Sequence, residues 1–461
     1  MDDRVRVAGG AIAALVGSFI FSGRADAQHP RVVRISGDTL ARPAEVAVAI
    51  NPTDPDNIVA VGLAEGRSAG VGITNYAFVT VDGGERWVTV PAPNPNARTQ
   101  GDDAIAFDAD GTAYRSYISF EGIRVDRPER AVNGIFVSRS PDGGISWRTP
   151  VPVVDHINTV HPFEDKPWIT ADRVDGSPCR GNLYVAWTRF DEYGSAAPSD
   201  SSVILFSRST DSGRSFSVPF RISEHGGNAV DSDSTVEGAV PAVGVDGTVY
   251  VAWAGPLGIV LDRSTDCGWT FGQERVIDAM PGGWDIPAGG LERHNGMPVT
   301  GVDHSDGPLR GSLYINWIDT RNGDPDVFLL ASRDGGETWE GPIRVNQDPP
   351  RNGADQLFTW MAVDPVDGSV NIVYLDRAGR EEGATGATLA RSVDGGRTFR
   401  TTPASPEPFV LDGGVFYGDY TGIDAYGGRV VAVYPRPAGT GRLAVEAAIF
   451  DFAPGTQEAR P

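Results

Sequence analysis

The chain has 461 residues, and 61 acidic against 39 basic side chains give it a formal net charge of −22. This charge repels phosphate backbones and anionic headgroups, so it excludes nucleic acid and anionic membranes as the main partners. The 58 glycines and 34 prolines suit many short strands joined by tight turns, and 10 Trp, 12 Tyr and 19 Phe can supply a substantial core.

The first 27 residues have the pattern of an export signal. Two arginines precede an apolar run from Val7 to Phe21, and Ala25-Asp26-Ala27 matches a small-residue cleavage site. The run is short for a membrane span, and no later segment is long and apolar enough to cross a bilayer. We therefore predict a signal peptide over residues 1–27, a secreted or periplasmic location, and a single domain over residues 28–461.

A short phrase recurs six times along the chain. The first copy reads Thr80-Val-Asp82-Gly-Gly84-Glu-Arg-Trp87, and every copy has a glycine two positions after the aspartate and closes on Trp or Phe. A phrase repeated at intervals of 55 to 69 residues is typical of a repeat architecture. The six aspartates are Asp82, Asp142, Asp211, Asp266, Asp334 and Asp394.

Each copy of the phrase lies between two strand-like runs, so it is predicted to be a hairpin connection. The glycine supplies backbone angles that a side chain would forbid, and the aspartate can accept hydrogen bonds from N–H groups of its own turn. The closing aromatic residue opens the next strand and fills the gap between neighbouring sheets. The six aspartates are therefore predicted to be structural.

A second phrase, an apolar run ending in Asp or Asn such as Ala104-Ile-Ala-Phe-Asp108, accompanies each turn. One unit is then strand 1, turn, strand 2, loop, strand 3, repeated phrase, strand 4, which is the plan of a propeller blade. A seventh unit around Tyr420–Asp424 lacks its fourth strand, which Arg31–Ile35 can supply from the other chain end. We predict an all-β fold, a seven-bladed β-propeller of four-stranded antiparallel blades, with six blades as the alternative.

The repeated phrase resembles the Asp-box (BNR) repeat of sialidases and related exported propellers, over nearly all of residues 28–461. The resemblance implies a β-propeller that acts on or binds glycans. Sialidases have six blades and an Arg-Ile-Pro phrase near the start, whereas this chain has seven units and reads Arg34-Ile35-Ser36. The chain is therefore more similar to exported bacterial proteins that are called sialidase-like from their boxes alone.

The Asp-boxes join strands 3 and 4, so they define one face of the propeller, the box face. The connections from strand 2 to 3, and from strand 4 to the next strand 1, lie on the opposite face, the loop face. The resemblance to sialidases places ligands on the loop face around the central opening. Polar residues that lead into the first strands there are Glu45, Asp102, Asp103, Glu164, Asp165, Glu237, His294, Asp355 and Asp419.

Four arginines follow second strands on the loop face: Arg189, Arg321, Arg377 and Arg436. Guanidinium groups bind carboxylates bidentately, so these arginines are predicted to bind an anionic sugar. The alternative is salt bridging within and between blades, because Asp319 and Asp376 lie close to two of them in the sequence.

Carboxylates around a pocket can act as general acid and base in glycoside cleavage. The resemblance adds a tyrosine nucleophile helped by a glutamate. By their face alone, the candidate catalytic residues are Tyr420, Glu237 and Asp102. The structural alternative is that Tyr420 opens an inner strand and simply packs.

Histidines support a competing hypothesis, because His161, His225 and His294 fall in successive connections between blades. Imidazoles on one face could hold a transition metal or act as the base of a lyase. Their spacing matches no tight metal motif, so we expect no cofactor and regard solvated loop histidines as the alternative.

The two cysteines are predicted to lie on the box face of adjacent blades. Cys179 falls in the turn between strands 1 and 2 of the third unit, and Cys267 falls inside the fourth Asp-box. In an exported protein this placement favours a disulfide, with two buried free thiols as the alternative.

Three functions remain open from the sequence. The first is an exo-glycosidase, sialidase-like, that acts on an acidic sugar. The second is a non-catalytic propeller that binds glycan or protein, and the third is a lyase of uronic-acid polysaccharides. In each case we expect a carbohydrate or protein partner and a monomer.

Overall fold

The computed structural model describes residues 29–65, 72–121, 131–291, 293–381 and 383–453. The signal peptide predicted over residues 1–27 lies outside this part of the chain. The described residues form strands, turns and loops, and none of them belongs to a helix that could span a membrane.

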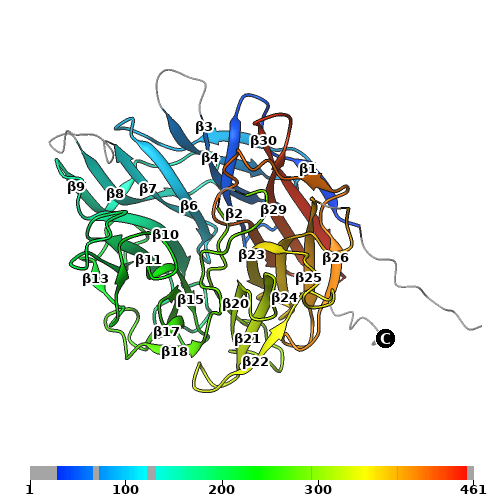
Figure 1. Ribbon diagram of the computed structural model, residues 1–461. Helices are drawn as coiled ribbons and strands as arrows, with labels where there is room; N and C mark the ends of the chain where they lie inside the picture. Colours follow the sequence, from blue (N-terminus) through cyan, green and yellow to red (C-terminus); the bar gives the residue numbers. More distant parts are fainter. Residues whose placement is uncertain (1–28, 66–71, 122–130, 292, 382, 454–461) are drawn as a thin grey trace, which may run out of the picture.

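Seven antiparallel sheets follow one another around a central axis in chain order (Figure 1), which confirms the seven-bladed β-propeller and excludes the six-bladed alternative. Blade 1 contains β2 (Ala41–Ile50), β3 (Ile58–Glu65), β4 (Ile73–Thr80) and β5 (Val88–Pro91). Blade 2 contains β6 (Thr99–Phe107), β7 (Ala113–Glu121), β8 (Val132–Ser140) and β9 (Val151–Ile157). Blade 3 contains β10 (Phe163–Ala171), β11 (Leu183–Phe190), β12 (Ser201–Ser209) and β13 (Phe220–Arg221), with β14 (Gly227–Asn228) also paired to β12.

The remaining blades repeat this order from the inner strand outward. Blade 4 contains β15 (Glu237–Val243), β16 (Val249–Gly255), β17 (Gly258–Ser264) and β18 (Arg275–Asp278). Blade 5 contains β19 (Val299–Val302), β20 (Leu313–Asp319), β21 (Asp326–Ser332) and β22 (Glu340–Arg344). Blade 6 contains β23 (Gln356–Val363), β24 (Val370–Asp376), β25 (Ala384–Ser392) and β26 (Arg400–Pro403), with β27 (Phe409–Val410) also paired to β25.

Blade 7 closes the ring with strands from both ends of the chain. It contains β28 (Gly422–Tyr426), β29 (Arg429–Pro437), β30 (Leu443–Asp451) and, as its outer strand, β1 (Arg31–Arg34). The first strand of the described chain pairs antiparallel with the last, with Arg31 opposite Ile449. In Figure 1 the blue β1 accordingly lies beside the red β30. The sequence prediction for the fourth strand of this blade is confirmed.

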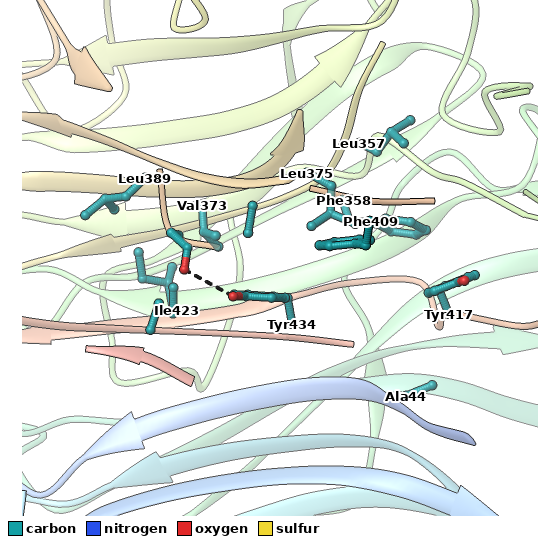
Figure 2. Close-up of a cluster of buried hydrophobic side chains, with 14 of the residues drawn as sticks. Ala44, Leu357, Phe358, Val373, Leu375, Leu389, Phe409, Tyr417, Ile423 and Tyr434 are labelled. Carbon is teal, nitrogen blue, oxygen red and sulfur yellow. Dashed lines mark hydrogen bonds between the residues drawn. The ribbon is translucent and has the colours of Figure 1, made fainter. Parts of the chain in front are cut away.

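The hydrophobic core is divided among the interfaces between adjacent blades. Figure 2 shows the packing between blades 6 and 7, where Leu375 and Leu389 face Ile423 and Tyr434. The hydroxyl of Tyr434 donates a 3.1 Å hydrogen bond to the carbonyl of Ala404 within this packing. Because apolar side chains fill both faces of the inner strands, the sheets stack around the axis as the apolar strand phrases predict.

The Asp-box turns join the third and fourth strands of blades 1 to 6 and bond internally. In the first, the Thr80 hydroxyl and the Arg86 N–H donate hydrogen bonds of 2.8 and 3.0 Å to Asp82 Oδ1. Gly84, with a φ of 90°, donates its N–H to Thr80 Oγ1 at 2.9 Å. The Arg86 backbone hydrogen bond is the largest effect that lowers the pKa of Asp82, to about 2. The turn thus uses its aspartate as a local acceptor.

A disulfide joins blades 3 and 4 on the box face. It links Cys179, in the turn between β10 and β11, to Cys267 in the fourth Asp-box, with 5.6 Å between the two Cα atoms. The bond lies on the box face of adjacent blades, where the repeat spacing predicts that the two cysteines lie close together.

Candidate functional site

Five inner strands carry a β-bulge near their loop-face ends. Each bulge interrupts the pairing with the second strand of the blade. The residue two positions before the first residue that pairs again has a positive φ. These residues are Glu45 (51°), Asp102 (48°), Lys166 (46°), Gly238 (74°) and Phe358 (52°). A positive φ is strained for a residue with a side chain, and bulges redirect side chains beside functional sites. The repeated bulge therefore builds a ring of redirected residues around the axis.

Charged side chains from the inner strands of blades 1 to 4, and from three connections between blades, meet at this end of the axis. We call this set the axial cluster: Glu45, Asp102, Asp165, Lys166, Asp231, Glu237, Arg293 and Asp419. The Lys166 ammonium contacts the Asp419 carboxylate and lies 3.4 Å from Glu237 Oε1. Arg293 Nε lies 2.8 Å from Asp419 Oδ1, and its terminal nitrogens donate hydrogen bonds of 3.0 and 3.2 Å to Asp231.

The acids of the axial cluster outnumber its bases, six carboxyls to two cations. Five of these six carboxyls are almost fully buried, among them Glu45 at 5 % exposed, Asp102 at 6 % and the fully enclosed Glu237. Burial raises the pKa of Glu45 to about 7, and it raises the pKa values of Asp102 and Glu237 well above their usual range.

Two other carboxyls of the cluster stay ionised. Burial opposes ionisation of Asp231 and Asp419, but the positive charges of Lys166 and Arg293 lower both pKa values below the usual range. The site therefore contains protonated and ionised carboxyls side by side, which is the arrangement that separates acid and base roles.

Several polar atoms of the cluster have no hydrogen-bond partner among the described residues. They include Asp102 Oδ1 and both carboxylate oxygens of Glu237. Glu237 Oε1 is in ion-pair range of Lys166 but lacks hydrogen-bond geometry. Buried carboxyl oxygens without partners are costly, so they suggest that a ligand or water completes the site.

A small cavity of about 30 Å³ lies inside the cluster. It is lined by Asp102, Lys166 and Asp419 together with an aromatic floor of Trp168, Trp360 and Tyr420. The two indole rings lie 4.2 Å apart, and Tyr420 meets Trp168 edge-on at 5.3 Å. A cavity of this volume admits a water molecule or an ion but excludes a sugar ring.

The structure brings the three candidate catalytic residues to the same end of the propeller axis. Asp102 and Tyr420 line the cavity, and Glu237 contacts Lys166. The Tyr420 hydroxyl donates a 3.4 Å hydrogen bond to the carbonyl of Asp103, and burial raises its pKa well above the usual value. A tyrosine held in this way packs in the floor and does not form a phenolate readily, so its role as nucleophile stays a prediction.

The four predicted substrate-binding arginines lie outside the axial cluster, and each has its own acidic partner. Arg321 lies 3.0 Å from Asp278 of the neighbouring blade and also pairs with Asp319. The other pairs are Arg377 with Asp355 at 2.8 Å, Arg436 with Glu446 at 3.0 Å and Arg189 with Asp191 at 3.5 Å. These contacts match the salt-bridge alternative, and a role in substrate binding stays a prediction.

The structure does not bring together His161, His225 and His294, the alternative metal ligands of the sequence analysis. His225 pairs with Glu274 at the rim and His161 is exposed. His294 is buried, its Nε2 accepts the Phe358 N–H at 3.3 Å, and burial lowers its pKa to about 3. Among the described residues, the one group of three potential ligands close enough to share an ion is Glu45, Asp102 and Asp419.

Sequence reasoning missed Lys166 and Arg293. Lys166 was detectable, because it stands six positions before the terminal Asp172 of its strand phrase, as Glu45 and Asp102 stand before Asn51 and Asp108. Arg293 lies in the long connection between β18 and β19, where no repeat spacing marks it.

The comparisons with known proteins support the fold. No family model and no curated protein matches the chain. A protein of unknown function from Dyadobacter fermentans is 15 % identical with a TM-score of 0.52, over 92 % of this chain and 99 % of that one. A Penicillium chrysogenum α-L-arabinanase is 10 % identical with a TM-score of 0.50, over 92 % and 99 %. A polysaccharide lyase, an ulvan lyase, is 14 % identical with a TM-score of 0.50, over 91 % and 96 %.

Sialidases also match, but with TM-scores of only 0.42 to 0.48. At these identities the likenesses show a shared propeller fold and leave the chemistry open. Membership of the Asp-box family therefore stays an interpretation of the sequence.

Proposed function

We propose that this chain is an exported, carbohydrate-active propeller that binds a glycan on the loop face, over the axial cluster, and cleaves a glycosidic bond there. The observation that carries the proposal is the convergence of protonated and ionised carboxyls with Lys166 and Arg293 at one end of the axis. Solved propellers of the same fold include proteins named as an arabinanase and an ulvan lyase, which is in keeping with this use of the fold.

The sugar would lie at the outer edge of the axial cluster, because the inner cavity is too small for a ring. Arg293 and Asp231 are the most accessible members there, with side chains 25 % and 11 % exposed. The Tyr193 hydroxyl donates a 2.7 Å hydrogen bond to Asp231 beside them. This edge offers an aromatic ring, a carboxylate and a guanidinium to sugar hydroxyls.

Glycoside cleavage needs one carboxyl that donates a proton to the leaving oxygen and one carboxylate that activates water. Burial keeps Glu237 protonated, since its pKa lies well above the usual range, and Asp231 is ionised. We assign the acid role to Glu237 and the base role to Asp231. The complete burial of Glu237 favours a second candidate function, a non-catalytic glycan-binding propeller.

The charge balance favours an uncharged sugar over the anionic sugar expected from the arginines. Both bases of the axial cluster already pair with ionised carboxylates, Lys166 with Asp419 and Arg293 with Asp231 and Asp419. The cluster therefore offers no uncompensated positive charge to attract an anionic sugar.

The test is turnover on a panel of neutral fluorogenic glycosides, sialosides and polysaccharides. We expect cleavage of a neutral glycan, and we expect Glu237→Gln to reduce kcat by at least about 100-fold because it removes the proton donor. Asp211→Asn in a box-face turn is the matched control and should keep the activity. Unsaturated products that absorb ultraviolet light would show that the protein is a lyase and not a hydrolase. Glycan-array binding without turnover would support the non-catalytic glycan-binding propeller. The absence of both turnover and binding would overturn the proposal.

Export and a monomeric state complete the proposal. The N-terminal pattern of residues 1–27 and the disulfide between Cys179 and Cys267 support a secreted or periplasmic location, because such bonds persist in oxidising compartments. Fractionation of expressing cells and the elution volume of the purified protein test these two points.

A further inference from the structure

Three carboxyl groups from three neighbouring blades converge at the loop-face end of the axis. Glu45 comes from blade 1, Asp102 from blade 2 and Asp419 from the segment that leads into blade 7. One oxygen of each lies within 4.8 Å of the other two, and all three residues are buried. The two ends of the chain close the ring within blade 7, where β1 pairs with β30.

The contacts of the cluster leave two of these acids without a cationic partner. Lys166 contacts Asp419 and Glu237, and Arg293 contacts Asp419 and Asp231. No described base forms an ion pair with Glu45 or Asp102. Glu45 accepts one hydrogen bond, from the Asp102 N–H at 3.0 Å.

An unpartnered atom points independently to a missing ligand. Asp102 is only 6 % exposed, lines the cavity, and its Oδ1 has no hydrogen-bond partner among the described residues. The backbone also holds Glu45 and Asp102 at positive φ angles of 51° and 48°. Strain at two adjacent acids persists when the surroundings enforce it, and it commonly accompanies ligand-binding positions.

We propose that Glu45, Asp102 and Asp419 bind a divalent cation of the calcium type. All the donors are carboxylate oxygens, which hard cations prefer, and the set contains no imidazole or thiolate. Oxygens up to 4.8 Å apart fit the 2.3–2.6 Å distances of calcium ligands. The cavity of about 30 Å³ leaves room for water to complete the coordination shell.

The cation would tie blades 1, 2 and 7 together at the ring closure. A ligand that binds only the folded chain stabilises it, so the cation should strengthen the junction between the two chain ends. This role goes beyond the proposed glycan cleavage and can be measured without any activity assay.

The competing account is that protons and Lys166 alone balance these acids. Burial raises the pKa of Glu45 to about 7, so a proton can occupy this group near neutrality. Under that account the protein would not respond to calcium, which makes the two accounts separable.

The test uses the full mature chain, stripped with a chelator and titrated with Tb³⁺ or Ca²⁺. Trp168 lines the same cavity as Asp102 and Asp419, so bound Tb³⁺ should show emission sensitised by tryptophan, and Ca²⁺ should quench it by competition. Ca²⁺ should also raise Tm by about 2–5 °C over the chelated protein.

Glu45→Gln and Asp102→Asn should each weaken Tb³⁺ binding at least about tenfold and abolish the Ca²⁺-dependent shift, since each removes a charged ligand. Asp211→Asn in a box-face turn should leave both signals intact. Wild-type protein that shows neither Tb³⁺ emission nor a Tm response to Ca²⁺ would overturn the proposal even if a variant fails to fold. Signals that persist in both ligand variants would overturn it as well.

Discussion

The backbone N–H of Asp102 donates a 3.0 Å hydrogen bond to Glu45, and the two residues occupy the same bulge position in neighbouring blades. Lys166 occupies that position in blade 3 and contacts Asp419 from the far side of the ring. One repeated β-bulge thus places two acidic side chains and one basic side chain around the same axis. The repeat supplies the geometry of the site, and the residue chosen at each copy supplies its chemistry.

Removal of the Lys166 charge should destabilise the protein in a pH-dependent way. Lys166→Met leaves Asp419 and Glu237 without their contact, and uncompensated buried charge typically costs about 3–5 kcal/mol. The loss should be larger at pH 8 than at pH 5, because protonation neutralises the stranded acids. Urea denaturation at the two pH values measures the difference, with Lys166→Arg as the charge-retaining control. An equal loss at both pH values would contradict this view of the cluster.

Asp262 should make the folded protein less stable as the pH rises. The residue is buried on β17 with one unpartnered oxygen, and burial raises its pKa to about 6, helped by the nearby Glu224 and Glu274. Between its unfolded pKa of about 3.9 and about 6, the folded state binds more protons, so the free energy of unfolding falls with rising pH.

Asp262→Asn removes this titration and should gain stability relative to wild type between pH 4 and pH 7.5. We expect a relative gain of about 1–3 kcal/mol, because a pKa shift of one unit corresponds to about 1.4 kcal/mol. Denaturation midpoints of both proteins at the two pH values provide the measurement. A variant whose pH dependence parallels that of wild type would show that Asp262 does not carry the effect.

The Asp-box aspartates should matter for stability and not for glycan recognition. Asp211 accepts backbone hydrogen bonds from Arg214 and Ser215 at 3.0 and 2.9 Å. Asp211→Ala should cost about 1–3 kcal/mol, as expected for hydrogen bonds to a charged acceptor, and Asp211→Asn should cost less. Thermal melts and glycan binding measured on the same samples check this. A variant that loses glycan binding while its Tm is unchanged would indicate that the functional site lies on the box face.

The disulfide should stabilise the contact between blades 3 and 4. Cys179 and Cys267 are 88 positions apart, so their bond restricts the unfolded chain over a long loop. Replacement of both by serine should cost about 2–5 kcal/mol. Chemical denaturation of the double variant measures this cost, and thiol labelling of native wild type should find no free thiol. Two readily labelled thiols would contradict the bond.

The repeat made the fold predictable, and the same regularity explains what stayed hidden. Aspartates at near-constant spacing marked the blades, and the seventh strand phrase at Tyr420–Asp424 located the blade that lacks an Asp-box. Lys166 was detectable by alignment of the bulge positions. Arg321 pairs with Asp278 of the preceding blade. This pairing depends on how side chains pack between the two blades, which the repeat spacing does not encode. Arg293 reaches the axis from a long connection whose path is set by tertiary contacts.

The central claim is that ligand binds over the axial cluster, at the loop-face end of the axis. Two arginines offer a matched comparison, since Arg293 lies in the axial cluster and Arg173 lines a box-face cavity beside His304. The decisive measurement is the glycan affinity of Arg293→Lys and Arg173→Lys, each checked for unchanged Tm. We predict that Arg293→Lys weakens binding at least about tenfold, because lysine cannot reproduce the bidentate contacts, while Arg173→Lys binds as wild type does. Weakened binding in Arg173→Lys with unchanged binding in Arg293→Lys would contradict the account.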